Sequence, residues 1–239
     1  MAYRGRRVLA VVPARSGSKG LPHKNLLEIG GASLIARAGA VLAALPWIDA
    51  RVMSTDSPDY AAEGERHHLS APFLRPAHLS TDTAGAVETM QHAVEQAEAR
   101  FGGRFDIVLI IEPTSPLRTA DDIEAAVDLL VSDPEAESVV TVSLVDPKFH
   151  PLKIFRVEDG RLQYFQAGGA QIVARQQLEP LYTRNGVCYA LTRSCLMEYG
   201  RIIGPATRAL VIERPVVNID SATDVAIARA LLREGHPSS

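Results

Sequence analysis

The sequence is poor in aromatic residues and carries little net charge. Phe, Trp and Tyr make up 5% of its 239 residues, and only one residue is Trp. Such a composition offers no surface on which the bases of a single-stranded nucleic acid could stack. The formal net charge is −3, so no overall positive field attracts a polyanion. We therefore expect no nucleic-acid partner, and any phosphate group must be bound by a local cluster of Lys and Arg.

Cysteine is also scarce, and long apolar runs are missing. Cys188 and Cys195 lack the CxxC spacing of metal and redox sites. Apolar and polar residues alternate around them, so we expect one buried thiol on a strand and the other on the following helix. The apolar run after the basic residues 1–7 is short and leads to Pro13 and Arg15, not to a cleavage site or a membrane span. We expect a cytoplasmic protein that does not bind membranes.

Apolar runs that fit strands alternate with apolar stripes that fit helices along one domain of residues 1–239. We expect strands at residues 8–12, 50–54, 106–111, 138–143, 187–191, 210–212 and 216–219. The expected helices cover residues 34–45 behind Ser33, a stretch from Pro58, residues 83–100, residues 120–130 behind a Thr119–Asp122 capping box, and residues 221–233 with Ser221 and Asp224 as caps. This alternation predicts an α/β fold with a doubly wound, mostly parallel, Rossmann-type sheet. Ligands of such sheets bind at the carboxyl ends of the strands.

Residues 147–182 break this alternation. Two apolar segments, 154–157 and 162–165, flank Glu158-Asp159-Gly160, which is a hairpin signal, and the remaining residues show no helical period. We interpret residues 147–182 as an arm inserted into the sheet domain.

A basic, glycine-containing loop follows the first predicted strand. Residues 13–25 (PARSGSKGLPHKN) contain the cations Arg15, Lys19 and Lys24 together with Ser16 and Ser18. Glycines in such a loop allow backbone amides to approach phosphate oxygens, while the cations neutralise their charge. The loop matches neither GxxxxGK[ST] nor GxGxxG, so it does not predict a P-loop ATPase or a dinucleotide site. The alternative is a basic turn that is merely solvated.

Five further blocks extend this loop into a family resemblance. They are residues 75–84 (RPAHLSTDTA), 113–118 (PTSPLR), 150–153 (HPLK), 185–186 (NG) and 218–220 (NID). In order and approximate spacing, the set resembles the CMP-sialic acid synthetases, also called acylneuraminate cytidylyltransferases. The resemblance implies an α/β domain with a dimerisation arm, and hence a homodimer. It also implies a reaction of CTP with a small acidic sugar, in which the anomeric hydroxyl of a nine-carbon keto sugar acid attacks the α-phosphate and pyrophosphate leaves.

The resemblance also implies which residues bind CTP and the metal. Arg15, Lys19 and Asp220 are the expected catalytic residues, and the expected CTP-binding residues are Arg15, Ser18, Lys19, Lys24, Asn25, Arg75 and Arg118. Arg75 and Arg118 could instead fix loop carbonyls with their several donors. Mg²⁺ takes hard oxygen ligands, and Asp220 is the candidate, although an acid before Ser221 could simply complement a helix dipole. Asn218 is a second candidate ligand, neutral where many relatives have Asp.

The acceptor side departs further from the family pattern. Glu112 stands where sialic acid synthetases often have Gln, and residues 201–204 lack an aromatic pair that some relatives carry. Lys153, Arg175 and Arg184 are candidates to bind the acceptor carboxylate, and Gln176, Gln177 and Asn185 to bind hydroxyl or acetamido groups. Surface solvation or packing of the arm would explain the same residues. The acceptor could thus be an eight-carbon keto sugar acid or a phosphonate, and a nucleotide-binding regulator without turnover is a further alternative.

Overall fold

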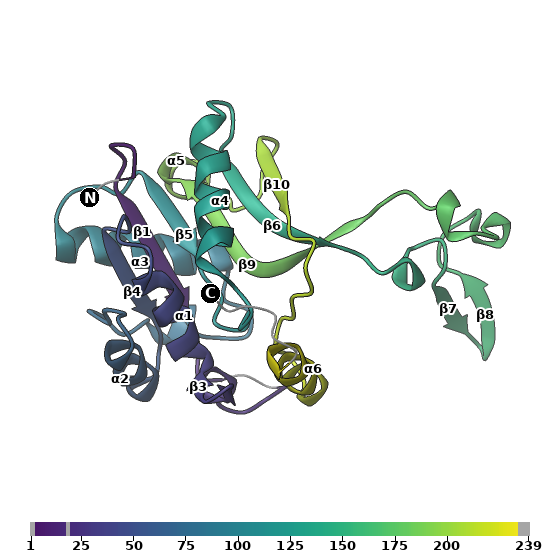
Figure 1. The fold of residues 1–239 in the computed structure, drawn as a ribbon, viewed down its shortest axis with the longest axis horizontal. Coiled ribbons are helices and arrows are strands. Elements are labelled where there is room, and N and C mark those ends of the chain that lie inside the picture. The colour runs from purple at the N-terminus through teal and green to yellow at the C-terminus, as the bar shows by residue number, and fades with distance from the viewer. Residues whose placement is uncertain (1–2, 18–19, 234–239) are drawn as a thin grey trace.

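The core of the protein is a six-stranded sheet covered by helices on both faces (Figure 1). The structure, a computed structural model, describes residues 3–17 and 20–233. The strand order is β10-β6-β9-β5-β1-β4. The bounds are β1 Val8–Pro13, β4 Ala50–Ser54, β5 Ile107–Ile110, β6 Ser138–Leu144, β9 Tyr182–Thr192 and β10 Thr207–Val211. β1 pairs in parallel with β4 and β5, and β10 with β6, whereas β9 is antiparallel to both neighbours. The predicted mostly parallel α/β sheet is confirmed.

The two faces of β1 explain its continuous apolar run. Val8, Ala10 and Val12 pack on one side with residues of α1 (Leu34–Ala43), α2 (Pro58–Arg66) and α4 (Ala120–Ser132). Leu9 and Val11 pack on the other side with α3 (Ala86–Phe101) and α5 (Arg193–Met197). A strand buried on both faces has no polar side to present, so both residue parities are apolar. Cys188 on β9 and Cys195 on α5 are buried free thiols, as expected.

Short polar residues begin the helices at the predicted places. Ser33 Oγ accepts from the Ala36 amide at 2.9 Å, and Thr119 and Asp122 form the predicted capping box of α4. Asp224 Oδ2 accepts from the Ser221 amide at 2.7 Å and so caps α6 (Ala222–Arg233). The remaining short elements are β2 Glu28–Ile29, β3 Ala32–Ser33, and the 3₁₀ turns Lys24–Leu26, Ala77–Leu79, Pro147–Phe149, Gly169–Gln171 and Arg175–Gln177. No helix within residues 3–17 and 20–233 is long and apolar enough to cross a membrane.

The predicted strand at residues 216–219 is wrong. The backbone ladder ends where the Ile212 amide bonds to Val142 O at 2.8 Å. Arg214 then pairs with Asp122 at the start of α4, and the Ile219 amide bonds to Thr114 O at 2.8 Å. Two separate anchors thus replace a strand ladder, and Val217 and Ile219 pack with Ile29, Leu34 and residues of α6. As a result this segment crosses the carboxyl ends of the strands instead of extending the sheet.

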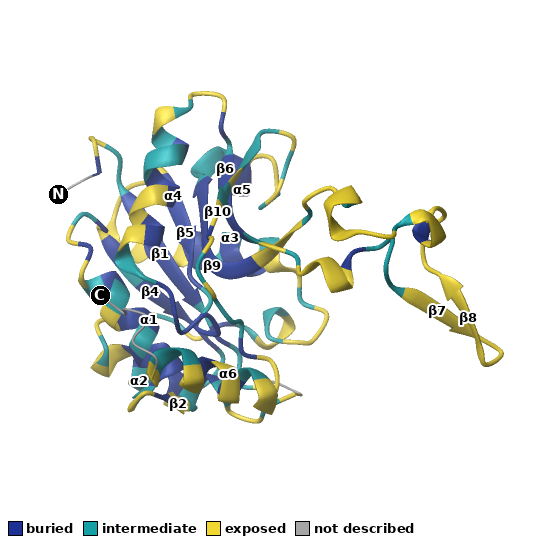
Figure 2. Cartoon of the chain, turned by 45° about the vertical axis from the view of Figure 1, so that its right-hand side comes forward, coloured by how far each residue is buried: buried dark blue, intermediate teal, exposed yellow. Residues whose placement is uncertain are grey.

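The arm projects from the sheet domain and ends in a hairpin (Figures 1 and 2). β7 (Phe155–Glu158) and β8 (Arg161–Tyr164) pair antiparallel, as predicted. Asp159 and Gly160 between them have φ of 51° and 74°, which suits the two left-handed positions of a tight turn. Every residue of both strands is exposed.

Candidate active site

A cavity of about 740 Å³ opens at the carboxyl ends of β1 and β5. Segments that are far apart in the sequence meet there. They are the basic loop of residues 13–25, called the phosphate loop below, the loop before α3, the turn after β5 and the 218–220 segment. The predicted site residues that line it are Arg15, Lys24, Asn25, Arg75, Glu112, Arg184, Asn218 and Asp220. The sheet therefore positions most of the predicted site at the edge where doubly wound folds bind ligands.

The end of β4 holds the start of the phosphate loop. Ala14 donates its amide to Ser54 O at 3.0 Å. The amide and hydroxyl of Ser16 both donate to the Asp56 carboxylate, at 2.9 and 2.7 Å. Burial alone would raise the pKa of Asp56, but the hydrogen bonds from Ser16 and from its own backbone amide, together with the charge of Arg75, outweigh burial and lower the pKa. Ser18 and Lys19 lie outside the described residues.

Two cations of the loop are paired with acids across the cavity. Arg15 Nη1 lies 2.6 Å from Asp82 Oδ1, and Lys24 Nζ lies 2.8 Å from Asp220 Oδ1. Lys24 also donates to Ile219 O at 3.2 Å. Both pairs are partly solvent-exposed, so each is weak enough to exchange for a polyanion.

Asn25, which lines the cavity, has an unused hydrogen-bond acceptor. The side chain is 3% exposed, and its Oδ1 has no hydrogen-bond partner among the described residues. A buried polar atom without a partner is uncommon in folded proteins. Because Asn25 lines the cavity, a ligand hydroxyl or amino group is the donor that would satisfy it.

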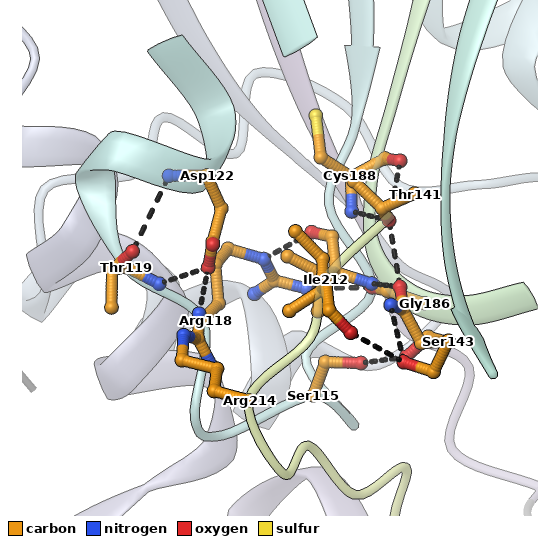
Figure 3. A network of polar contacts seen from close by, with 12 residues as sticks. Ser115, Arg118, Thr119, Asp122, Thr141, Ser143, Gly186, Cys188, Ile212 and Arg214 are labelled. Atoms are coloured by element: carbon orange, nitrogen blue, oxygen red, sulfur yellow. Dashed lines mark hydrogen bonds and ion pairs between the residues drawn. The ribbon is translucent and has the colours of Figure 1, made fainter. Parts of the chain in front are cut away.

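The two candidate arginines of the nucleotide site differ in their surroundings. Arg75 lines the cavity, while its Nε donates to Ser54 Oγ at 3.1 Å and its Nη2 to Ser54 O. Arg118 is outside the cavity lining and 2% exposed. It donates to Glu112 O at 2.6 Å and to Val187 O, and also to Gly186 O at 2.9 Å (Figure 3). Burial lowers the pKa of Arg118 to about 10. The geometry favours the alternative in which Arg118 fixes loop carbonyls.

The predicted acceptor residues fall into three groups. Glu112 and Arg184 line the cavity. Asn185 is buried, and both polar atoms of its amide form hydrogen bonds within the sheet, since Oδ1 accepts from Thr141 Oγ1 at 2.7 Å and Nδ2 donates to Ser143 Oγ at 3.0 Å. The remaining four lie in the arm and do not line this cavity, namely Lys153, Arg175, Gln176 and Gln177. Gln177 Oε1 caps its own turn by accepting from the Ala174 amide at 2.8 Å.

The two metal-ligand candidates are oxygen donors at the cavity wall. Asp220 is 75% exposed, and Asn218 Nδ2 donates to Glu112 Oε2 at 3.2 Å. Within the described part of the chain, no three His, Cys, Asp or Glu residues form a metal cluster. One carboxylate and one amide oxygen nevertheless fit Mg²⁺, which commonly takes one or two carboxylates and completes its shell with water and phosphate oxygens.

A sequence model of the cytidylyltransferases matches residues 9–203. The chain belongs to the cytidylyltransferase family. This match spans the phosphate loop, the turn after β5, the arm and the antiparallel strand β9. The family resemblance stated from the sequence is confirmed.

Known cytidylyltransferases resemble the chain over almost its whole length. It is 29% identical over 228 residues to the CMP-N,N'-diacetyllegionaminic acid synthase of Legionella pneumophila, covering 95% of this chain and 96% of that one. It is 25% identical to the pseudaminic acid cytidylyltransferase of Campylobacter jejuni, covering 97% and 98%. A solved CMP:2-keto-3-deoxy-manno-octonic acid synthetase complexed with CTP superposes with a TM-score of 0.70 at 16% identity, covering 95% of this chain and 99% of that one, which shows the shared fold.

Sequence analysis did not predict three residues near the cavity as site residues. Asp56 holds Ser16, Asp82 pairs with Arg15, and Tyr189 lines the cavity from β9. Burial, followed by the negative charge of Glu112, raises the pKa of Tyr189 to about 12. Asp56 could have been found because it follows a predicted strand end directly. Tyr189 could not, since an aromatic residue in an apolar strand is indistinguishable from core.

Proposed function

We propose that this cytidylyltransferase transfers CMP from CTP to the anomeric hydroxyl of a nonulosonic, sialic-acid-like sugar acid, with release of pyrophosphate. The observation that carries the proposal is the cavity itself. It combines the phosphate-loop cations Arg15 and Lys24 with the oxygen donors Asn218 and Asp220, which come from the other end of the chain. The relatives named as legionaminic and pseudaminic acid enzymes support this acceptor class.

The triphosphate takes over the cations that acids hold in the free protein. Arg15 and Lys24 exchange Asp82 and Asp220 for phosphate oxygens, and Lys19 is expected to assist from the same loop. Cations placed where charge accumulates stabilise the transition state of phosphoryl transfer. Arg75 and Asn25 stand further along the cavity for the nucleoside, where Asn25 Oδ1 needs a donor.

Release of Lys24 also frees Asp220 for a metal ion. We propose that Mg²⁺ is the cofactor and that Asp220 and Asn218 hold it. When bound, Mg²⁺ neutralises charge on the triphosphate oxygens. The residues themselves fix these two donors, because Ile219 between them is fully buried and its amide is bonded to Thr114 O at 2.8 Å.

The acceptor binds beyond the α-phosphate. Arg184 lines the cavity, and its guanidinium has no side-chain partner among the described residues, so we assign it to the acceptor carboxylate. The acceptor's anomeric oxygen then attacks the α-phosphorus, the bond to the β-phosphate oxygen breaks, and pyrophosphate leaves while the hydroxyl proton passes to water. Lys153, Arg175 and Gln176 would reach an acceptor only across a dimer, because they lie in the arm.

We further propose that the enzyme is a homodimer joined through the arm and that it works in the cytoplasm, where CTP is made. The dimer is supported by one face of the hairpin. Phe155, Val157, Leu162 and Tyr164 all lie on it, and they are 45–68% exposed. A two-stranded hairpin with an uncovered apolar face is marginal alone and gains stability from a partner surface.

The proposal is tested by incubating the purified protein with CTP, Mg²⁺ and a panel of acids. The panel holds sialic, legionaminic, pseudaminic and deaminated nine-carbon acids, an eight-carbon keto sugar acid and a phosphonate. We expect pyrophosphate with at least one nine-carbon acid, none with ATP in place of CTP, and none after EDTA treatment. Turnover of only the eight-carbon acid or the phosphonate would assign a different acceptor. Binding of CTP without pyrophosphate release from any acid would support the non-catalytic regulator.

A further inference from the structure

Two positions that the sequence sets apart from the family pattern touch in the structure. Asn218 Nδ2 donates to Glu112 Oε2 at 3.2 Å, although 106 residues separate them. Both residues line the cavity, Glu112 from the turn after β5 and Asn218 from the segment that crosses the strand ends. Within the described residues, no Lys, Arg or His lies at ion-pair distance from Glu112. The carboxylate therefore interacts with the Asn218 amide and with the hydroxyl of Tyr189.

The chemistry of the two groups fixes the orientation of the amide. An ionised carboxylate only accepts hydrogen bonds, so it must face the nitrogen of the Asn218 amide and not the oxygen. The amide is planar, and its two ends diverge from the carbonyl carbon. Asn218 Oδ1 is thus turned away from Glu112. An oxygen held in this way is a hard, neutral ligand with no need to reorient when a cation arrives.

Glu112 is itself held firmly enough to act as a support. Its carbonyl oxygen accepts from Arg118 Nη2 at 2.6 Å and from the Ser115 amide at 3.2 Å, so the turn that carries it is anchored in the protein interior. Gly186 lies directly against the pair, with φ of 70°. A Cβ at this glycine would stand 2.5 Å from Glu112 Oε2 and 2.6 Å from Asn218 Nδ2. The absence of a side chain there makes room for the contact.

Asn218 is anchored from the backbone as well. The side chain of Ile219 is fully buried, and its amide is bonded to Thr114 O at 2.8 Å. The side chains on either side of it, Asn218 and Asp220, both line the cavity. The buried isoleucine thus keeps the two oxygen donors on the cavity side, and only the rotation of the Asn218 amide is left for a neighbour to decide.

We propose that Glu112 is a positioning residue for the metal site. Its carboxylate holds the Asn218 amide with the nitrogen toward Glu112, so that Asn218 presents Oδ1 to the cation beside Asp220. This inference rests on the proposed function, because it assumes that Asn218 and Asp220 hold Mg²⁺ together with CTP. It explains how the neutral Asn218 serves at a position where many relatives have Asp. Both oxygens of an Asp carboxylate can bind a cation, so an Asp there would need no partner to orient it.

The test measures Mn²⁺ binding to the CTP complex by the electron paramagnetic resonance of free Mn²⁺, without an acceptor and without turnover. The proteins compared form a double-mutant cycle, which consists of wild type, Glu112→Gln, Asn218→Ala and the double variant. The control is Glu135→Gln, on the exposed surface. Mutation of a residue that orients a metal ligand typically lowers metal affinity by about 10- to 100-fold. We expect Glu112→Gln to weaken Mn²⁺ binding about tenfold in the wild-type background and less than about twofold when Asn218 is Ala. Glu135→Gln should leave it unchanged.

An equal loss in both backgrounds would mean that Glu112 acts on the cation directly, and no loss in either would mean that it does not position Asn218. Both results overturn the inference while leaving cytidylyl transfer intact. A wild-type protein that binds no CTP would overturn the proposed function and this inference together. Thermal unfolding of each variant checks the fold, and should Glu112→Gln be unstable, Glu112→Asp, which keeps the charge but shortens its reach, should weaken Mn²⁺ binding in the same coupled way.

Discussion

At the scale of single residues, buried hydrogen bonds separate residues with a polar atom left for a ligand from residues whose polar atoms hold the protein together. Asn25, which lines the cavity, has a buried oxygen without a partner among the described residues, whereas both the oxygen and the nitrogen of the Asn185 amide form hydrogen bonds within the protein. Both residues belong to family motifs, so the sequence alone assigned both to ligands. The sequence could not show that the Asn185 amide is used internally. Its partners are Thr141 and Ser143, which lie more than 40 residues away on β6.

Arg118 gives the clearest residue-scale prediction. Its guanidinium bonds to three carbonyls in the interior, and the single ammonium group of Lys cannot reach all three. We expect Arg118→Lys to lower the free energy of unfolding by about 3 kcal/mol, since carbonyls are left without donors. Urea denaturation measures it, with Arg104→Lys on the surface as the matched control. A variant of normal stability with a raised KM for CTP would show instead that Arg118 contacts the nucleotide.

Asp56 gives a prediction about pH. Its pKa is lowered in the folded protein because the Ser16 donors, its own backbone amide and the charge of Arg75 together outweigh the effect of burial. A lowered pKa means that the stabilisation is complete above the unfolded-state pKa, near 3.9, and is lost as the pH falls through the folded-state value. We expect Asp56→Asn to cost about 1 kcal/mol at pH 7 and to raise the KM for CTP. The difference in unfolding free energy should shrink below about pH 4, and a difference that stays constant down to pH 2 would contradict this account.

At the scale of elements, local signals predicted most of the fold. The two-sided apolar run of β1, the capping box at Thr119 and the turn at Asp159 and Gly160 each appear in the structure where the sequence placed them. The prediction of a strand at residues 216–219 failed because apolar residues can pack against helices as well as within a sheet. Two contacts keep this segment out of the sheet, the ion pair of Arg214 with Asp122 and the hydrogen bond from the Ile219 amide to Thr114 O. Both join residues that are distant in the sequence, so local patterns could not reveal them.

The hairpin of the arm carries the element-scale prediction. Val157 and Leu162 are cross-strand partners on its apolar face, and each is 68% exposed. If this face joins two subunits, Val157→Asp with Leu162→Asp should convert a dimer to a monomer in sedimentation velocity at micromolar concentration, because buried carboxylates without partners are costly. Gln163→Asp on the opposite face is the control and should remain dimeric. A double variant with unchanged mass would place the interface elsewhere.

At the scale of the whole molecule, the order of the strands creates the site. β1 and β5 run side by side in the same direction, so the loop after β1 and the turn after β5 share one edge of the sheet. The 212–220 segment then crosses that edge and delivers Asn218 and Asp220 to the cations of the loop. Sequence blocks at opposite ends of the chain thereby become one cavity, which is why the family motifs were informative before any contact was known.

The central claim is transfer of the α-phosphate of CTP to a sugar acid, and labelled CTP tests it most directly. CTP carrying ³²P at either the α or the γ position is incubated with Mg²⁺ and the acid that supports turnover. We predict that the α label appears in the CMP-sugar and the γ label in pyrophosphate, in equal amounts. A γ label released as orthophosphate, or an α label recovered only as free CMP, would show hydrolysis of CTP and would contradict this account.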